Sequence, residues 1–401
     1  MGPERGSSVA IIGCGINGLF CAYYLLKEGY SVTIIDRNKH GVTSKNNAGL
    51  LTPSLPSAPE MGYADIAKAS TVGLGAVYIS PSQILRNISW FMSALKHRKE
   101  RGGKALMSLG SRSVELYGQF LRKEHMDADV IRGVGAFYES EDDARTLAEE
   151  YDGRFIGSSD LSGMGYTNLG GGIMFDKELS INSMKLFDGL RSRVRKLGAR
   201  LLLGTEAELI CGNGSVEHII SGSEKVTADT YIAAGGSWSN DLLKPTGYNP
   251  MIIPARGLVL LFSTGKQRII SAPALLEPEG VAVAQHSDNL FRATSFFEFK
   301  GTKSEFSEGR KRWLLDMLES HIIKYSRLKQ IYEGSGFRPC TPDQMPVVGR
   351  VPGYSNLLIA GGQCRVGVTL APITGKIITD MVNGAKPKVS GFEYLSPARF
   401  S

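Results

Sequence analysis

The sequence lacks the cysteine and histidine patterns that build disulfide-rich or metal-binding proteins. Its five cysteines are odd in number and form no C-x-x-C pair, and its six histidines show no metal-ligand spacing. We therefore expect no disulfide framework and no metal site. We also expect a reducing compartment, because disulfide-poor chains are typical of one.

Long apolar runs and nucleic-acid signatures are missing as well. No stretch approaches the roughly 18 apolar residues of a membrane-spanning helix, and Gly13 and Gly15 interrupt the first apolar run, so no leader is expected. Lys and Arg number 46 against 39 Asp and Glu, a net charge of +7 that favours anionic ligands or an anionic surface. The most basic segment, residues 96–101, has no interleaved aromatic residues, so we expect no nucleic-acid partner.

The chain does contain a strand, a glycine turn and a helix close to its start. The apolar residues 8–12 lead into Gly13-Cys14-Gly15-Ile16-Asn17-Gly18 and then into a helical pattern. Gly13 permits a tight turn, Gly15 lets backbone approach a phosphate, and Gly18 lets the helix pack closely. A second apolar strand ends at Asp36, the spacing of a carboxylate that binds ribose hydroxyls. Together these features predict dinucleotide binding at a helix N-terminus.

Two more strand-to-glycine turns occur far along the chain. Residues 230–234 lead into Gly235 and Gly236, and residues 356–360 lead into Gly361 and Gly362. A reduced flavin carries negative charge on its ring and gains from a second helix N-terminus, whereas a nicotinamide needs one such turn. The pattern therefore favours FAD.

These separated turns predict an α/β fold with a Rossmann-like cofactor domain assembled from distant segments. We assign residues 1–80, 183–245 and 335–390 to that domain. Strand patterns dominate residues 252–299, so residues 81–182 and 246–334 are expected to form an inserted substrate domain built on an antiparallel sheet.

Four segments resemble the FAD-dependent D-amino-acid dehydrogenase and glycine oxidase group, and the resemblance covers essentially the whole chain. They are Gly13 to Asp36, residues 47–53, residues 228–238, and Gly336-Phe337-Arg338-Pro339-Cys340-Thr341-Pro342-Asp343, which is the most specific. Val281 stands where glycine oxidases carry a tyrosine that contacts substrate, so the dehydrogenases are the nearer part of the group.

The resemblance implies a glutathione-reductase-like flavoprotein of the D-amino-acid-oxidase type, with Arg338 gripping the substrate carboxylate beside the flavin. A guanidinium suits that task because it binds a carboxylate through two hydrogen bonds. Arg256 and Arg292 are further candidates for the carboxylate, and Phe296, Phe297 and Phe299 form either a wall for the substrate side chain or plain core. The expected FAD-binding residues are Gly13, Gly15, Ile16, Asn17, Gly18, Asp36, Arg37, Ser44, Asn47, Ala48, Gly49, Leu50, Leu51, Ala207, Ala234, Gly235, Trp238, Gly336, Gly362, Gly367, Val368 and Thr369.

The resemblance implies FAD-dependent oxidative deamination of an amino acid. The preferred substrate class is D-amino acids, and D-proline or hydroxyproline are candidates within it. Hydride leaves the α-carbon for flavin N5, and the electrons pass to a quinone or dye. Three alternatives stay open: an amine oxidase for glycine, sarcosine or proline, a 2-hydroxy-acid dehydrogenase, and a non-catalytic flavoprotein subunit.

We expect a cytoplasmic protein with a peripheral contact on the inner membrane face. Within residues 78–98, apolar side chains lie beside the basic residues 96–98, as in amphipathic helices that lie on membranes. The apolar residues are Ile84, Leu85, Ile88, Trp90, Phe91 and Leu95. The alternative is a helix packed over the flavin domain.

Overall fold

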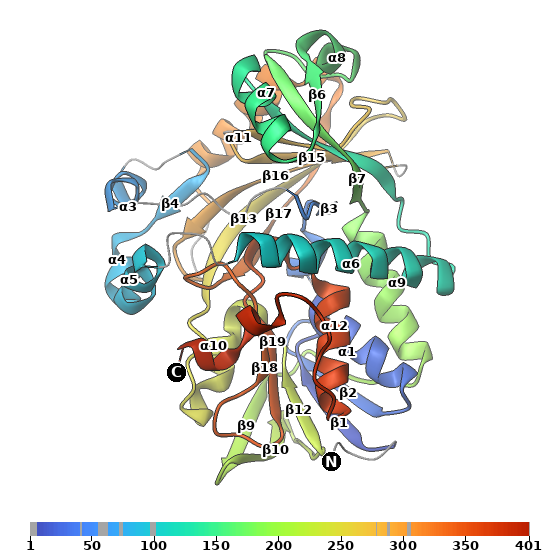
Figure 1. Ribbon diagram of the computed structural model, residues 1–401, viewed down its shortest axis with the longest axis vertical. Coiled ribbons are helices and arrows are strands. Elements are labelled where there is room, and N and C mark those ends of the chain that lie inside the picture. Colours follow the sequence, from blue (N-terminus) through green and yellow to red (C-terminus); the bar gives the residue numbers. More distant parts are fainter. Residues whose placement is uncertain are drawn as a thin grey trace.

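The computed structural model describes residues 6–40, 42–54, 63–71, 75–96, 102–277, 279–286, 289–302 and 306–400. Residues 97–101 of the basic segment, and with them part of the expected membrane-surface helix, lie outside the described residues. Figure 1 shows two layers around two sheets, with the N- and C-termini both in the lower layer.

The lower layer is built on a six-stranded sheet of buried apolar strands. Its order is β18 (Val347–Arg350), β19 (Leu357–Gly361), β12 (Thr230–Ala233), β1 (Ser8–Ile12), β2 (Ser31–Asp36) and β8 (Arg200–Leu203). Neighbours run parallel except β18 and β19. Near-continuous apolar strands are typical of parallel sheets covered on both faces.

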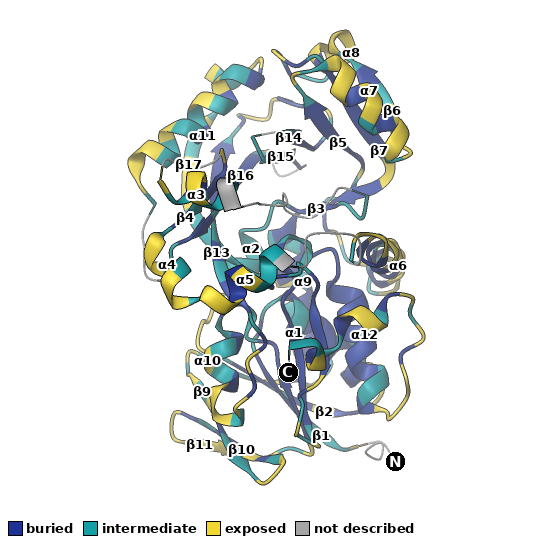
Figure 2. Ribbon diagram, turned by 60° about the vertical axis from the view of Figure 1, so that its left-hand side comes forward, coloured by how far each residue is buried: buried dark blue, intermediate teal, exposed yellow. Residues whose placement is uncertain are grey.

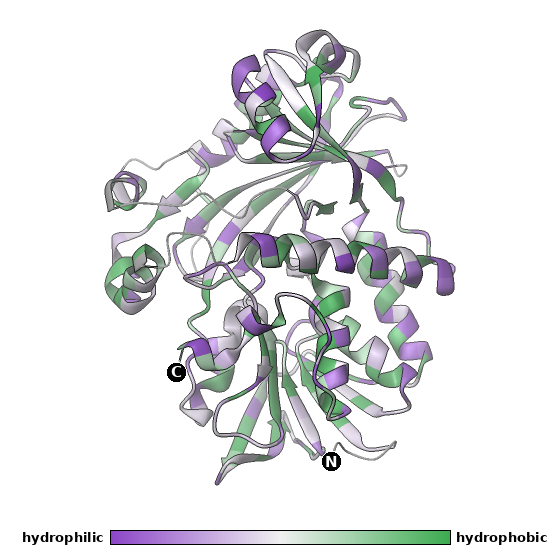
Figure 3. Cartoon of the chain, viewed as in Figure 1, coloured by the Kyte–Doolittle hydropathy of each residue, from purple (hydrophilic) through white to green (hydrophobic). Residues whose placement is uncertain are grey.

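Two groups of elements cover this sheet. The helices α1 (Ile16–Lys27), α9 (Ser183–Lys196) and α12 (Ala371–Val382) form one large apolar core with it. A small sheet of β9 (Ala207–Gly212), β10 (Ser215–Ser221) and β11 (Glu224–Val226) packs in a second core with it. Figure 2 shows buried residues in the middle of the lower layer, in strands of the sheet and in helices α1 and α12, and Figure 3 shows apolar residues there. The predicted Rossmann-like α/β fold is confirmed.

The upper layer is built on one large sheet. Its order is β17 (Lys329–Cys340), β13 (Ile253–Ser263), β16 (Leu290–Phe299), β15 (Val281–Gln285), β14 (Ala274–Glu277), β5 (Ile131–Tyr138), β7 (Gly171–Ser180) and β3 (Leu50–Leu51), with β4 (Val77–Ile79) on β16 and β6 (Arg154–Gly157) on β7. The sheet is antiparallel, as expected, except at two parallel pairs, β14 with β5 and β16 with β4.

The remaining helices surround the two sheets. They are α2 (Val42–Lys45), α3 (Tyr63–Thr71), α4 (Pro81–Arg86), α5 (Ile88–Lys96), α6 (Gly103–Lys123), α7 (Glu141–Glu150), α8 (Ser158–Gly163), α10 (Ser239–Leu243) and α11 (Glu308–His321), and short 3-10 turns include η1 (Gly236–Trp238) and η4 (Cys364–Val366). Helix α6 crosses between the layers in Figure 1 and shares a core with α12.

The chain passes between the layers more often than the expected domain boundaries allow. Strand β4 belongs to the predicted cofactor domain, yet it pairs with β16 of the large sheet. Helix α6 belongs to the predicted substrate domain, yet it packs against helices of the lower layer. Both segments sit between the layers, where local sequence patterns do not show which sheet they join. The boundaries as a whole stay a prediction.

The sequence predicted no disulfide framework, yet one disulfide is present. Cys340 and Cys364 are joined, with 4.3 Å between their Cα atoms and 24 residues between them in sequence. The end of β17 meets the η4 turn here, a contact that sequence spacing cannot show. Cys14, Cys21 and Cys211 are free thiols.

A buried carboxyl group lies in strand β7. Glu178 is 4% exposed, and its Oε1 accepts a hydrogen bond of 2.6 Å from the Ser54 amide. Its Oε2 is buried and has no hydrogen-bond partner among the described residues. Burial raises the pKa of Glu178 to about 7, since desolvation disfavours the charged form.

We expect this raised pKa to make stability depend on pH. Between pH 4.5 and about 7, Glu178 stays protonated in the folded protein but is ionised in the unfolded chain. Its contribution to the free energy of unfolding is therefore complete below pH 4.5 and is lost as pH rises through about 7. Glu178→Gln removes this dependence. The difference in free energy of unfolding between the variant and the wild type therefore changes by about 3 kcal/mol from pH 4.5 to 7. Urea unfolding at a series of pH values measures it. Glu115→Gln, an exposed ion-pair carboxylate, should track the wild type, and parallel curves for wild type and Glu178→Gln would contradict the prediction.

Candidate active site

A cleft of about 830 Å³ runs between the two layers, at the carboxyl ends of β1, β2 and β12. This is the edge where parallel α/β sheets bind nucleotides. The structure brings most of the predicted cofactor residues to its wall: Gly13, Gly15, Ile16, Asn17, Asp36, Arg37, Ser44, Asn47, Ala48, Leu50, Ala207, Ala234, Gly235, Trp238, Gly336, Gly367, Val368 and Thr369. Gly18, Gly49, Leu51 and Gly362 do not line the cleft.

The first glycine turn fits tightly against the neighbouring backbone. Gly13 has φ +119°, and a Cβ there would lie 2.2 Å from the Ala234 carbonyl oxygen. A Cβ on Gly18 would lie 2.0 Å from the Gly13 carbonyl oxygen, so Gly18 serves helix packing behind the cleft. A Cβ on Gly15 would meet only Ser44 Oγ, at 3.5 Å. The turn therefore keeps one side open, where backbone can approach a ligand.

Polar groups gather on the cleft wall at the start of helix α1. The first amide of that helix, Ile16 N–H, donates a hydrogen bond of 3.0 Å to Ser44 Oγ. Asn17 Oδ1, Ser237 Oγ and Gln363 Nε2 are buried and have no hydrogen-bond partner among the described residues, and all three residues line the cleft. Buried polar groups are normally hydrogen-bonded, so the wall fits a polar ligand such as the expected dinucleotide.

Asp36 is fixed at the end of β2, where the ribose is expected. Its Oδ2 accepts a hydrogen bond of 2.6 Å from the Cys14 amide, and its Oδ1 accepts one of 2.7 Å from the Asn38 amide. Next to it, the Arg37 guanidinium stacks 4.2 Å from the centre of the Trp238 ring. The carboxylate thus has a fixed orientation on the cleft wall.

Arg338 lies in β17 and faces the cleft. Its Nη1 donates a hydrogen bond of 2.6 Å to the Phe296 carbonyl, and its guanidinium lies 4.5 Å from the Phe297 ring centre. Gly257 lies opposite, and a Cβ there would lie 2.1 Å from Nη1, so any larger residue would displace the guanidinium. No described carboxylate forms an ion pair with Arg338. Burial and, next, the nearby charge of Arg365 lower its pKa to about 10, so it stays charged at neutral pH.

Arg365 is a second cleft arginine that sequence reasoning missed. It lies in η4, 6.0 Å from the Phe297 ring centre, and lines the cleft with Arg338. Burial lowers its pKa, and the carboxylate of Glu277 opposes that shift. The available signal was its place in the third strand-to-glycine segment, beside Gly362 and Gly367.

The structure does not bring Arg256 or Arg292 into the cleft. The Arg256 guanidinium lies 4.3 Å from the centre of the Phe306 ring. Arg292 Nη1 donates to the Lys45 carbonyl at 2.8 Å, the Asn47 carbonyl at 2.6 Å and Ser183 Oγ at 2.7 Å. Both side chains therefore belong to the protein's own packing. Of the three candidate phenylalanines, Phe297 lines the cleft, while Phe296 and Phe299 are buried in core.

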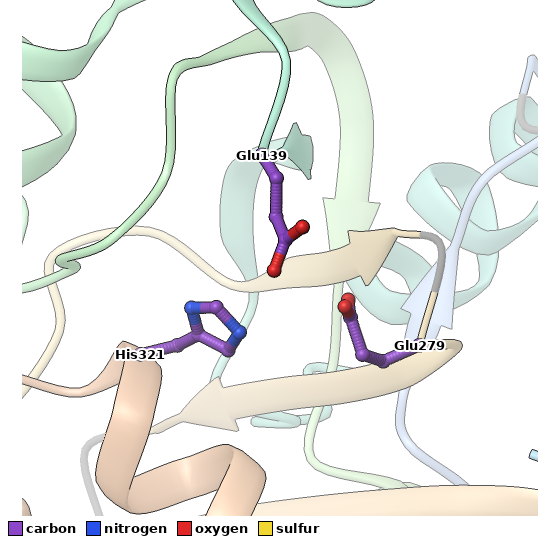
Figure 4. A group of neighbouring side chains, drawn as sticks. All are labelled: Glu139, Glu279 and His321. Carbon is purple, nitrogen blue, oxygen red and sulfur yellow. The ribbon is translucent and has the colours of Figure 1, made fainter. Parts of the chain in front are cut away.

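Three potential metal ligands meet away from the cleft. Glu139, Glu279 and His321 place ligand atoms within 4.8 Å of one another, and Figure 4 shows the His321 ring turned toward both carboxylates. They come from three distant segments, so sequence spacing could not reveal them. Glu139 is exposed, and His321 Nδ1 already lies 3.2 Å from the Thr167 carbonyl. These side chains alone do not define a metal site.

The fold and the cleft define a dinucleotide-binding oxidoreductase. The family model described as FAD dependent oxidoreductase (DAO) matches residues 8–381, and the chain belongs to that family. Its cofactor is FAD, as the sequence predicted.

Individual relatives show the same likeness over nearly full length. The chain is 25% identical to a D-amino acid dehydrogenase of Rhizorhabdus wittichii, across 95% of this chain and 97% of the relative. Among solved structures, a glycine oxidase from Geobacillus kaustophilus superposes with a TM-score of 0.78 at 18% identity, covering 99% of both chains. L-proline dehydrogenase from P. horikoshii superposes with a TM-score of 0.75 at 16% identity, covering 99% of this chain and 98% of that one.

We expect Asp36→Ala to weaken FAD retention by about 1–3 kcal/mol, the scale for losing a charged hydrogen-bond acceptor. Flavin fluorescence released during dilution or a chaotrope titration measures the loss. Asp229→Ala is the matched control, because its carboxylate accepts bonds from Ser8 outside the cleft. Equal flavin release from both variants would remove Asp36 from the cofactor site.

Proposed function

We propose that this protein oxidises an amino acid, most directly a D-amino acid, at its α-carbon. The product is an imino acid, which water hydrolyses to a 2-oxo acid and ammonia. The observation that carries the proposal is Arg338, a cleft guanidinium that forms no ion pair with a carboxylate in the part of the chain that the structure describes. A substrate carboxylate supplies the missing partner. The name of the Rhizorhabdus wittichii relative supports the choice of substrate class.

The side chains around Arg338 suit a carboxylate. Two parallel N–H···O bonds from a guanidinium fix both position and direction of the substrate, and Arg365 adds a second positive charge. The Phe297 ring centre lies 4.5 Å from the guanidinium of Arg338 and 6.0 Å from that of Arg365. With its carboxylate held there, the substrate presents the α-carbon to the cofactor.

FAD supplies the hydride acceptor when bound. We propose that the Gly13 to Gly18 turn holds its pyrophosphate, Asp36 its ribose, and residues 47–51 its ring. Arg292 fixes the start of that last segment by binding the Lys45 and Asn47 carbonyls. We assign no side-chain base, because a substrate with a deprotonated amine needs none.

Arg338→Met tests the proposal. We expect kcat/KM for amino acids to fall by roughly 2–5 kcal/mol, the scale for truncating one partner of a buried charge pair. The flavin spectrum should stay unchanged, and kcat/KM for amines without a carboxylate should hardly change.

Arg256→Met is the control, because that guanidinium stacks on Phe306 outside the cleft. Equal losses for amino acids and carboxylate-free amines in Arg338→Met would exclude the carboxylate role.

We further propose that electrons pass to a quinone at the inner membrane face. Leu85, Ile88 and Met92, here called the α4–α5 ridge, are 73%, 54% and 44% exposed, and apolar side chains on a surface helix bind the lipid interface. The neighbouring Trp90 and Phe91 instead pack with Phe299 in a core. Among the described helices, none is long and apolar enough to span a bilayer.

Two measurements test the electron acceptor and the ridge. Stopped-flow re-oxidation should be faster with a soluble quinone than with air. Anionic liposomes should co-sediment the wild type, and a Leu85→Ser, Ile88→Ser, Met92→Ser variant should bind several-fold less, while Ile323→Ser, also exposed, binds normally. Rapid turnover with dioxygen alone would make the protein an oxidase, and unchanged liposome binding would exclude the ridge.

A further inference from the structure

The disulfide lies beside both cleft arginines. Cys340 ends β17 two residues after Arg338, and Cys364 begins η4 immediately before Arg365. Cys364 itself lines the cleft. The bond therefore joins the two segments that carry the guanidinium groups, although those segments are 24 residues apart in sequence.

The two arginines need such a connection, because their charges repel. Burial and, next, the charge of Arg365 lower the pKa of Arg338, since a nearby like charge disfavours the charged form. Both also share one ring, that of Phe297, at 4.5 and 6.0 Å. Without a carboxylate between them, repulsion favours a wider spacing of the two segments.

The backbone at Cys364 is held in a strained conformation. Its φ is +42°, in the left-handed region that residues other than glycine seldom adopt. Strain of this kind persists where surrounding contacts fix the position. Here Cys340 forms an isolated β-bridge with Gln363, and Trp90 Nε1 donates a hydrogen bond of 3.1 Å to the Cys340 carbonyl.

We propose that the Cys340–Cys364 disulfide positions Arg338 and Arg365 for the substrate carboxylate, so that carboxylate binding depends on the thiol state of this pair. The inference rests on the proposed function, because it assumes that these arginines bind a carboxylate. Cys340 and Cys364 are positioning residues, and neither takes part in the oxidation itself.

Reduction of the bond takes two electrons and two protons and yields two thiols. With tris(2-carboxyethyl)phosphine, the phosphine supplies the electrons and becomes its oxide, taking its oxygen from water. The buried free thiols should not react during this treatment. Burial raises the pKa of Cys14 and of Cys21 to about 12, which makes both unreactive. The remaining thiol, Cys211, is only partly buried and is controlled by Cys211→Ser.

The experiment uses the FAD-loaded protein before and after reduction, with the number of thiols verified by alkylation and mass spectrometry. The Kd of benzoate, a carboxylate without an amine, is read from the flavin absorbance, and KM and kcat are measured for an amino acid. We expect reduction to raise both Kd and KM roughly 10- to 100-fold, the effect of a displacement of about 1 Å in a binding group. Flavin retention and turnover of a carboxylate-free amine should stay unchanged, and re-oxidation should restore affinity.

Variants separate this inference from the proposed function. Cys340→Ser with Cys364→Ser should match the reduced wild type and ignore the reductant, whereas Cys211→Ser should respond as the wild type does. If oxidised protein binds benzoate through Arg338 and verified reduction leaves Kd unchanged, or releases flavin instead, the positioning role is wrong. If oxidised wild type and Arg338→Met bind benzoate equally, the proposed function fails, and this inference fails with it.

Discussion

The site depends on how closely the backbones of β1 and β12 approach at their carboxyl ends. Gly13 leaves no room for a side chain beside the Ala234 carbonyl, and two backbone bonds of 2.8 Å, Gly13 to Ile35 and Ala234 to Ile12, tie the ends of three strands together. Because these strands are parallel, the turns that follow them all open on one edge. The N-terminus of α1 and the Gly235 turn therefore share a single cleft.

A second connection joins the two layers. Arg292 comes from β16 of the large sheet, yet its Nη1 binds the carbonyls of Lys45 and Asn47 and the hydroxyl of Ser183 at the start of α9. A buried guanidinium requires acceptors, and here they come from segments that border the cofactor cleft. Arg292 thereby ties the start of residues 47–51, the segment proposed to face the flavin ring, to the large sheet.

The charge in the cleft explains why a carboxylate is the expected ligand. Arg338 and Arg365 lie side by side over Phe297, and burial lowers the pKa of each. Two desolvated positive charges are unfavourable unless an anion joins them. Glu277 partly offsets the charge of Arg365, whereas Arg338 has no ion pair among the described residues. We therefore propose Arg338 as the main partner of a substrate carboxylate.

The sequence by itself determined the α/β fold and the FAD cofactor, and it predicted residues that line the cleft, because glycine turns and Asp36 are local features whose chemistry follows from their neighbours in the chain. It also marked Arg338 through a contiguous motif. Only the tertiary structure decided which arginines meet in the cleft. Arg365 lines it because η4 meets the end of β17. Arg256 stacks on Phe306 instead, and the carbonyls of Lys45 and Asn47 hold Arg292. The Cys340–Cys364 bond likewise depends on two segments meeting in space, and such contacts leave no spacing in the sequence.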